Sequence, residues 1–494
     1  MTTSLADTWA ELTATALLGT DRRPLPPPPV GPAGEFGHGS DVAVALLDRA
    51  AAVQAARRAG AVPEVAGPPL PACPPDERPP CLAPAAHRLG RILRGEHPDL
   101  LEEWLRTLTA AGRAAPPEHV VDLVDRSGAA PALRPVVVDA AGPVAAWLSE
   151  LLPGLGWDIG PPMDPREAWE RGEPAERIEA LRRLRSADPA AARDLLATGL
   201  PGERAELRAA AYGTLAAGLG PEDESLLERG LDDRVAAVRQ CAAELLAALP
   251  SSAWVQRMVR RAARMVEITG PAGHDRFEIA LVAPVPPSWA RDGIDAAALP
   301  GTSLGVHVLW QVVAGTPLGW WEAQAPVEHL VVLAAEHELG PVLLAGWSTA
   351  AIRQRDSRWA RLLVGEAPEP GLVAVLEPVD LVQLAADVGS VEQVLTPVAL
   401  AAFEALPSPW PGEVRLGVAE AIVALFAQRR VGRHQAPSLR RLARALDPAM
   451  LREVAESAGV LALPPPLEGV RDDLVDLLCF RSALREELAE GGAR

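Results

Sequence analysis

The chain has 494 residues and a formal net charge of −18, and it contains neither lysine nor asparagine. The missing lysine excludes a Schiff base, a Ser-Lys nucleophile and the phosphate-binding lysine of P-loop enzymes. The negative charge disfavours nucleic acid as a partner, because non-specific binding to it takes its affinity from phosphate neutralisation.

Residues 1–23 lack the features of a signal peptide, because Asp7 and Glu11 stand where a basic region and an uninterrupted apolar segment would be needed. No apolar run elsewhere approaches the roughly 18 residues of a membrane span. Four cysteines are also few for a secreted, disulfide-stabilised chain of this length. We therefore expect a cytoplasmic protein that has no membrane partner.

Residues 1–165 are predicted to form an N-terminal helical region with proline-rich loops. Alanine and leucine favour helices, for example over 41–58 and 100–111. The stretches PLPPPPVGP and GPPLPACPPDERPP cannot be helical, since proline lacks an amide hydrogen and clashes with the preceding turn. We expect extended segments or loops there.

Cys73, Cys81 and His87 lie close enough in the sequence to suggest a metal site. Seven residues separate the two cysteines, however, whereas structural zinc sites use closer pairs, and no fourth ligand is evident. We interpret the cysteines as ordinary thiols in a proline-rich loop and predict no metal and no cofactor. A metal ion held by these three residues stays open as the alternative.

Residues 166–266 contain a helical pattern that recurs. Leu207 and Arg208 align with Val238 and Arg239 at an offset of 31 residues (238 − 207). The second copy carries an apolar stripe at the spacing of one face of an α-helix. This stripe consists of Val235, Val238, Ala242, Leu245 and Leu249. The side chains that we expect to be buried are Leu215, Val238, Leu245 and Leu246.

Helix start signals divide this block into short helices. Asp188 stands before a proline, Asp232 and Asp233 precede the second copy, and Ser251 or Ser252 precedes the helix after it. Because a single helical hairpin buries too little apolar surface to be stable alone, the hairpins are expected to stack as a solenoid.

The segment DDRVAAVRQCAAELLAAL, residues 232–249, resembles the second helix of a HEAT repeat. It has the capping Asp, the Val-Arg pair and the following stripe of small residues and leucines. The likeness covers about two repeat units, from Glu203 to Met265. It implies a scaffold of stacked helical hairpins.

The whole chain also resembles an uncharacterised family of high-GC bacterial proteins known only as a domain of unknown function. The segments ALLGTDRRPLP and CPPDERPPC, the HEAT-like block and the RDGI segment at residues 291–294 carry this likeness. The resemblance implies a neighbourhood with MoxR-type ATPases, von Willebrand A-type proteins and SWIM zinc-finger proteins. It implies no catalytic residue.

Residues 267–303 break the helical pattern. The segment FEIALVAPVPPSW combines short apolar runs with prolines, which predicts one small irregular or β insertion near 269–300. Helical segments return over 304–494, and we interpret them as degenerate helical repeats. The large core anchors expected there are Trp310, Trp320, Trp321, Trp347 and Trp359. The predicted fold is therefore an all-α, HEAT-like helical-hairpin solenoid with proline-rich loops.

Two motifs in the C-terminal repeats invite a catalytic interpretation. His329 and Glu336 share a helix face at i, i+7, but such a pair usually belongs to a solvated face. Ser348 lies in a near match to a nucleophile elbow, but the surrounding pattern is helical and the motif ends in alanine. We predict no catalytic and no cofactor-binding residue.

Four arginines gather on one side of a helix predicted over 252–266, opposite an apolar face. They are Arg257, Arg260, Arg261 and Arg264. In an acidic protein such a cluster suits carboxylate-rich segments of a partner protein, so these are the candidate partner-binding residues. The alternative is a solvated face, with arginines such as Arg208 and Arg239 paired to acids of adjacent repeats.

The sequence therefore favours a protein-interaction scaffold or accessory factor whose partner is a protein. The family resemblance adds a MoxR-type ATPase system as its setting. The alternative is an enzyme built on a HEAT-like scaffold, such as a lyase or a glycosylase, with a site that the sequence does not identify.

Overall fold

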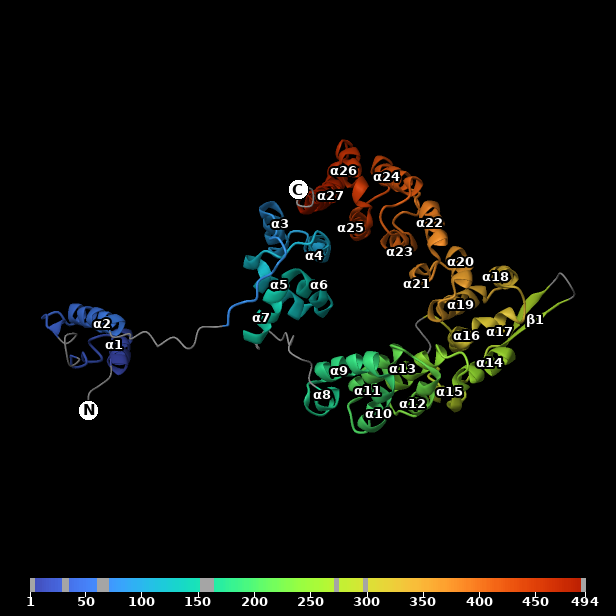
Figure 1. Cartoon of the computed structure of the whole chain (residues 1–494), viewed down its shortest axis with the longest axis horizontal. Helices are drawn as coiled ribbons and strands as arrows, with labels where there is room; N and C mark the ends of the chain where they lie inside the picture. Colours follow the sequence, from blue (N-terminus) through green and yellow to red (C-terminus); the bar gives the residue numbers. More distant parts are fainter. Residues whose placement is uncertain are drawn as a thin grey trace. The chain divides into compact units, whose positions relative to one another are not determined.

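The structure is a computed structural model of the chain, and it describes residues 5–28, 35–59, 71–151, 164–270, 275–295 and 301–489. Contacts between residues divide the chain into two compact units, Met1–Cys73 and Pro74–Arg494. The described residues form 27 α-helices and one two-stranded sheet (Figure 1). The predicted all-α helical-repeat fold is confirmed.

The first unit consists of α1 (Leu5–Leu18) and α2 (Val42–Ala59), which pack against each other. Its small core is formed by Leu12, Leu46 and Val53. The carboxylate of Asp41 accepts hydrogen bonds from the backbone amides of residues 43 and 44 and thereby begins α2.

The second unit is a succession of short helices, many of which have proline at their first position. Proline suits that position because its φ is already helical and it has no amide hydrogen to leave unpaired. The first series is α3 (Ala83–Leu93), α4 (Leu101–Ala110), α5 (Val120–Ala129), α6 (Arg134–Ala141) and α7 (Pro143–Leu151). The second series is α8 (Pro165–Arg171), α9 (Pro174–Ala187), α10 (Pro189–Gly199), α11 (Ala205–Gly213), α12 (Glu224–Gly230), α13 (Ala236–Ala247) and α14 (Ala253–Met265).

A third series of helices follows the sheet. It begins with α15 (Pro287–Arg291), α16 (Leu304–Gly315), α17 (Leu318–Glu322), α18 (Val327–Glu336), α19 (Gly340–Gln354), α20 (Ser357–Glu366) and α21 (Pro370–Val373). It ends with α22 (Pro378–Asp387), α23 (Pro397–Ala405), α24 (Gly412–Ala427), α25 (Ala436–Ala445), α26 (Leu451–Gly459) and α27 (Pro465–Ala489).

Helices that are not consecutive in the chain stack beside one another in the second unit. One row of neighbours consists of α9, α11 and α13, and another consists of α16, α19, α21, α23, α25 and α27. The intervening helices make their own row, in which α22 contacts α24 and α24 contacts α26. Stacking of this kind lets each hairpin bury the apolar face that it cannot bury alone.

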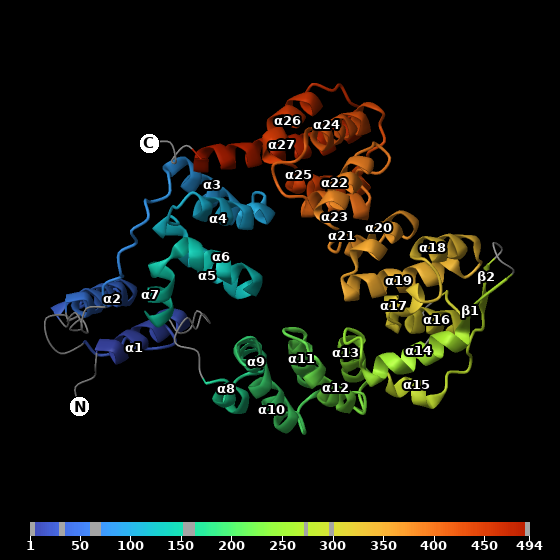
Figure 2. The ribbon, with the colours of Figure 1, turned by 45° about the vertical axis from the view of Figure 1, so that its right-hand side comes forward.

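Two hydrophobic cores hold the second unit together. One extends from Trp169 in α8 to Leu372 in α21. The other joins the helices α3–α7 to α21–α27, so that Trp104 of α4 shares a core with Phe403 of α23 and Leu478 of α27. Figure 2 shows α3 and α4 beside α27. The first helices of this unit therefore pack on its last ones.

The core of the repeat block largely follows the prediction. Leu215, Val238 and Leu246 are fully buried, as expected. Leu245 is only partly buried, because it lies at the edge of the face that α13 turns toward the core. The repeat pattern thus identifies the packing face correctly and misplaces one of its borders.

The predicted helix caps are confirmed at two of three sites. The side chains of Asp188 and Ser252 accept hydrogen bonds from backbone amides at the starts of α10 and α14. At α13 the N-cap residue is Val235, and Asp233 lies two residues earlier. Its carboxylate accepts from the amide of Val235 at 2.8 Å and also pairs with Arg208 at 2.7 Å.

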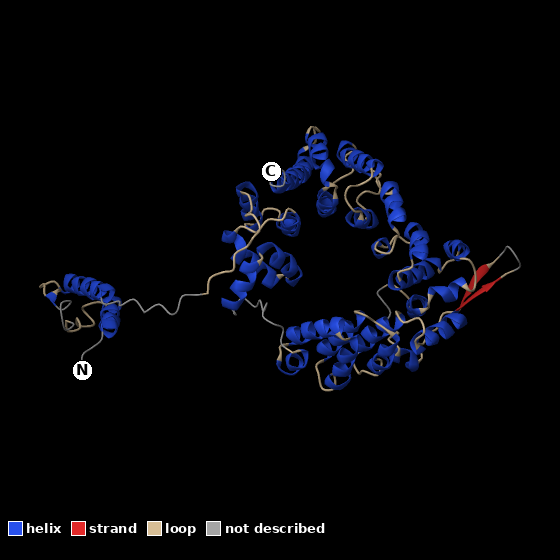
Figure 3. Ribbon diagram, in the orientation of Figure 1, coloured by secondary structure: helices blue, strands red, loops and turns tan. Residues whose placement is uncertain are grey.

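The predicted β insertion is confirmed as a short hairpin. β1 (Val266–Thr269) pairs antiparallel with β2 (Arg276–Ile279), with Val266 opposite Ile279 (Figure 3). Phe277 of β2 is buried, and its ring centroid lies 6.1 Å from that of Trp347 in α19. The hairpin is therefore anchored on the repeats that follow it.

The tryptophans of the later repeats divide into two groups. Trp321, Trp347 and Trp359 are fully buried, and the ring centroids of successive members lie 5.4 Å apart, as expected of core anchors. Trp310 and Trp320 are only partly buried, which differs from the prediction. Trp310 lines a pocket instead.

Candidate functional site

Two of the four candidate arginines on α14 are held by a single buried carboxylate. Arg257 donates to Asp292 at 2.7 Å and to Glu228 at 2.9 Å. Arg261 donates to the other carboxylate oxygen of Asp292, and its guanidinium lies 4.8 Å from the ring centroid of Trp289. Because Asp292 is only 2% exposed, both arginines are fixed against the chain itself.

The electrostatics of these two arginines differ. Burial lowers the pKa of Arg257, but hydrogen bonds and charge from Asp292 and Glu228 outweigh that effect, so the pKa is raised overall. Burial is stronger at Arg261 and lowers its pKa even though Asp292 opposes the change. Arg261 therefore depends on Asp292 for its place in the interior.

Arg260 and Arg264 lie on the exposed side of α14. Neither forms an ion pair with any residue in the described ranges. The structure thus brings Arg257 and Arg261 together at Asp292 and leaves the other two at the surface. Partner binding by the four arginines stays a prediction. Of the four side chains, those of Arg260 and Arg264 are accessible at the surface.

The RDGI segment, residues 291–294, is the piece of chain that this network fixes. Arg291 donates to Asp232 at 2.6 Å and to Glu228 at 3.2 Å, and the hydrogen bond with Asp232 raises its pKa. The carbonyl of Asp292 accepts from the indole of Trp254 at 2.9 Å. The segment is therefore held against α12 and α14.

A glycine lets this segment approach α13 closely. Gly293 has a φ of +80°, and a Cβ atom there would lie 2.9 Å from the Cβ of Ala243. Any other residue would be strained by both the conformation and the contact. Ile294 follows it and is buried.

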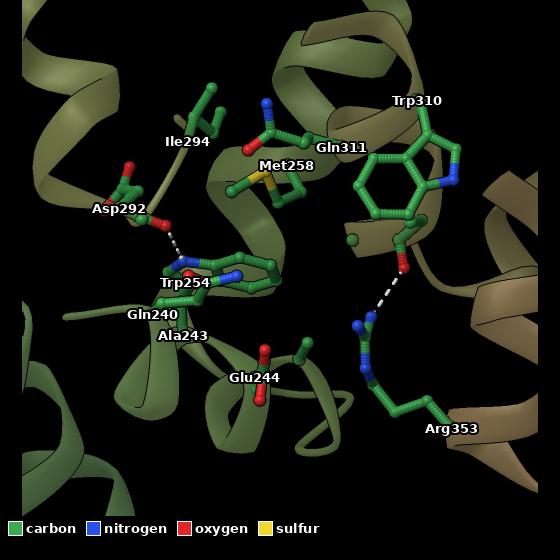
Figure 4. A pocket seen from close by; sticks show the side chains of 14 residues that line it. Gln240, Ala243, Glu244, Trp254, Met258, Asp292, Ile294, Trp310, Gln311 and Arg353 are labelled. Carbon is green, nitrogen blue, oxygen red and sulfur yellow. Dashed lines mark hydrogen bonds between the residues drawn. The ribbon is translucent and has the colours of Figure 1, made fainter. Parts of the chain in front are cut away.

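A pocket of about 100 Å³ lies beside the segment, between α13, α14, α16 and α19 (Figure 4). Its apolar lining is formed by Ala243, Ala247, Trp254, Met258, Ile294 and Ala314. Its polar lining is formed by Gln240, Glu244, Asp292, Gln311 and Arg353. The pocket thus lies beside the RDGI segment, between the row that contains α13 and the row that contains α16 and α19.

Arg353 is the cation of this pocket. Its Nη1 donates to the backbone carbonyl of Ala314 at 2.7 Å, and it forms no ion pair with a described residue. Burial lowers the pKa of Arg353, and the negative charge of Glu244 offsets that effect only in part. Figure 4 shows the guanidinium on the side of the pocket between Glu244 and Trp310.

Sequence reasoning did not find Arg353. It lies near the end of α19 within the degenerate repeats, where an arginine usually faces solvent. The available signal was Gly315, because a Cβ at that position would lie 2.8 Å from the ring of Trp254. That close approach of α16 to α14 brings the carbonyl of Ala314 within reach of Arg353.

Two wider hollows, of about 540 and 500 Å³, have charged linings that are largely paired within the chain. The first contains the Arg208–Asp233 pair, and the second contains Arg481 and Arg485 on Glu103. The Arg208 pair confirms the expectation that arginines bridge adjacent repeats. Arg239 differs, because it donates to the backbone carbonyls of residues 233 and 290 and not to an acid.

The three suggested metal ligands are Cys73, Cys81 and His87. Cys81 is a free thiol. Burial raises the pKa of Cys81 to about 11, which disfavours the thiolate that a metal requires. Within the described residues, no group of three or more His, Cys, Asp or Glu side chains is placed to hold a metal ion.

The two motifs weighed for catalysis are used structurally. The Nε2 atom of His329 lies 3.0 Å from the carboxylate of Asp275, while Glu336 is exposed. Ser348 is buried in α19, and its hydroxyl donates to the carbonyl of Leu344 at 2.9 Å. A hydroxyl tied to its own helix in this way is not presented as a nucleophile.

None of the helices in the described ranges is long and apolar enough to cross a membrane. Comparison with curated proteins finds no match, and comparison with solved structures also finds none. The sequence model of one family, described as a family of unknown function (DUF5691), matches residues 11–488. The match confirms the resemblance to an uncharacterised family, and the chain therefore belongs to this family of unknown function.

Proposed function

We propose that this chain is a protein-interaction scaffold of HEAT-like repeats, and that the exposed arginines of α14 contact an acidic segment of its partner. The observation that carries the proposal is the contrast within one helix. Arg257 and Arg261 are bound to Asp292, whereas Arg260 and Arg264 are exposed and make no ion pair with a described residue.

The ion pairs of Arg257 and Arg261 fix the helix from which Arg260 and Arg264 project. Because Asp292 holds α14 through two side chains, Arg260 and Arg264 project from a helix whose orientation is fixed. Their spacing of i, i+4 places both guanidinium groups on the same face. A partner carboxylate can then be bound bidentately at little cost in backbone ordering.

Charge supports a selective contact over a diffuse one. The chain carries a net charge of −18, so an acidic partner is repelled by most of its surface and attracted where guanidinium groups stand unneutralised. Exposed pairs are individually weak, at about 0–1 kcal/mol each. The stacked helices would supply the additional contact area that a stable interface of roughly 1,600 Å² needs.

The narrower form of the proposal makes the partner a component of a MoxR-type ATPase system in the cytoplasm. Its support is the sequence resemblance to a family with that neighbourhood, together with the free thiols of Cys81, Cys241 and Cys479, which fit a reducing compartment. Nucleic acid is a less favoured partner because of the overall charge.

The alternative function is an enzyme on the same scaffold, of the lyase or glycosylase kind. It would need acids or imidazoles that converge in a pocket with shifted pKa values. In the described pocket both carboxylate oxygens of Asp292 accept from arginines, and Glu244 is the other acid. We therefore favour the scaffold.

The test is quantitative affinity purification of the tagged full chain from its native cell. We compare the wild type with the double variant Arg260→Glu and Arg264→Glu, which leaves the Asp292 network intact. The control is the double variant Arg182→Glu and Arg183→Glu on the exposed side of α9. The proposal expects at least one co-purifying protein to fall about tenfold in the first variant only. Equal recovery in all three would overturn it.

A further inference from the structure

We infer that the pocket between α13, α14, α16 and α19 is a binding site for a carboxylate group on a short aliphatic chain, and that Arg353 is the residue that binds the carboxylate. The site is separate from the exposed face of α14, and the inference does not depend on the proposed partner surface. The candidate ligands are a free small organic acid and an acidic side chain of a protein segment.

The first argument is the unused hydrogen-bonding capacity of Arg353. A guanidinium group has five N–H donors, and among the described residues Arg353 donates one hydrogen bond, to the carbonyl of Ala314. Burial lowers its pKa and Glu244 offsets that effect only in part, so the half-buried cation lacks a full counter-charge. A bound anion would supply both the missing acceptors and the missing charge.

The second argument is the contrast between the half-buried Arg353 and two fully buried arginines of the chain. Arg185 is buried and donates to both carboxylate oxygens of Asp223, at 3.0 and 2.6 Å. Arg481 is buried and pairs with Glu103 at 2.7 Å. Arg353 has no such partner among the described residues, although it lies beside a hollow.

The size and lining of the hollow select the kind of anion. A volume of about 100 Å³ accommodates a carboxylate with a few methylene groups. Trp254, Met258 and Ile294 offer apolar surface to the stem. A single guanidinium matches one carboxylate bidentately, whereas a phosphate dianion calls for several cations or backbone amides.

Glu244 sharpens this selectivity. Its carboxylate shares the pocket with Arg353 and acts on it electrostatically without forming an ion pair. The negative charge would repel a dianion more strongly than a monoanion. The same charge weakens the binding of every anion, so replacing Glu244 with glutamine is expected to tighten binding.

The experiment measures binding of small probes to the full-length chain by ligand-detected NMR and calorimetry. The carboxylate probes are butyrate, for a free acid, and N-acetylglutamate N′-methylamide, for an acidic side chain flanked by peptide groups. N-acetylglutamine N′-methylamide is the neutral control, and inorganic phosphate is the dianion. We expect a carboxylate probe to bind about tenfold more tightly than the neutral control.

The two carboxylate probes separate the two sources. Binding of butyrate with an affinity equal to that of the peptide probe assigns the site to small acids. Binding of the peptide probe alone assigns it to an acidic protein segment. Equal binding of the neutral control, or tighter binding of phosphate, overturns the inference.

Three variants test where the carboxylate probe binds and in which direction each charge changes its affinity. Arg353→Gln is expected to weaken binding of the carboxylate probe about tenfold, and Glu244→Gln is expected to strengthen that binding. Arg361→Gln removes an exposed arginine of α20 and is expected to change nothing. Because Arg353→Gln also loses the hydrogen bond to Ala314, its fold is checked by circular dichroism. If Arg353→Gln does not fold, the test rests on Glu244→Gln, which is expected to fold because Glu244 is exposed. Unchanged or weaker binding of the carboxylate probe to Glu244→Gln would contradict the site.

Discussion

Arg481 in α27 donates from Nε to both carboxylate oxygens of Glu103 in α4, at 2.9 and 2.7 Å, although 378 residues separate them in the sequence. Arg485, one helical turn later, donates to the same carboxylate at 2.7 Å. The arginine–glutamate cluster therefore joins the first helices of the second unit to its last helix, and it lies over the core that Trp104 and Leu478 share.

Substitution Glu103→Gln is expected to destabilise the chain by about 3–5 kcal/mol, because it leaves the buried guanidinium of Arg481 without its counter-charge. The measurement is urea unfolding followed by circular dichroism. Glu102→Gln is the matched control, since Glu102 is exposed and, within the described part of the chain, pairs only with Arg106 on its own helix, so a loss of about 0–1 kcal/mol is expected. Equal losses in the two variants would show that the long-range cluster contributes nothing.

Asp292→Asn should destabilise the chain by about 3–5 kcal/mol, because two arginines of α14 lose their buried counter-charge at once. Asp232→Asn is the comparison, since that exposed carboxylate pairs with Arg291 and with no other arginine of the described ranges. Thermal unfolding of both variants provides the measurement. If Asp292→Asn melts no earlier than Asp232→Asn, the network does not fix the RDGI segment.

Truncation within one helix tests the burial assignment of the repeat core. Leu246→Ala removes a fully buried side chain and is expected to cost about 2–5 kcal/mol. Leu245→Ala, at the neighbouring and partly buried position, is expected to cost less. Equilibrium unfolding of the two variants measures the difference, and a larger cost at Leu245 would show that α13 faces its neighbours differently.

The Arg208–Asp233 pair predicts a dependence of stability on pH. The hydrogen bond from Arg208 holds the pKa of Asp233 below its ordinary value of 3.8. A carboxylate whose pKa is lowered by folding stabilises the folded state at pH values above the unfolded pKa, and that contribution is lost as the pH falls through the folded value.

The expected result is that Arg208→Gln is less stable than the wild type at pH 6 by about 1.5–3 kcal/mol, and that the gap narrows as the pH falls below 3.8. Urea unfolding at a series of pH values measures both chains. A gap of constant size across that range would mean that the carboxylate of Asp233 is not the group responsible.

The helical-repeat fold could be predicted because its signals are local. The match of Leu207 with Val238, the cap at Asp188 and the break in pattern near 269 each depend on a few adjacent residues. Such signals identify helices and their buried faces. They also led to the small β insertion that β1 and β2 form.

The features that were missed depend on distant partners. The burial of Arg261 requires Asp292, which lies 31 residues away, and the pairing of Arg481 requires Glu103. The pocket needs Arg353 to approach the carbonyl of Ala314. Helical periodicity places an arginine on a polar face but does not say whether another segment covers that face, so the four arginines of α14 appeared equivalent in the sequence.

The proposal that α14 is a partner surface is tested most directly by photo-crosslinking in the native cell. A benzophenone amino acid replaces Ala263, which is exposed between Arg260 and Arg264, and a second chain carries it at the exposed Val379 as the comparison. We expect a crosslink to one protein from position 263, which is absent from position 379 and is lost when Arg260→Glu and Arg264→Glu are added. No crosslink from position 263 beyond that from position 379, or one that survives the charge reversal, would contradict it.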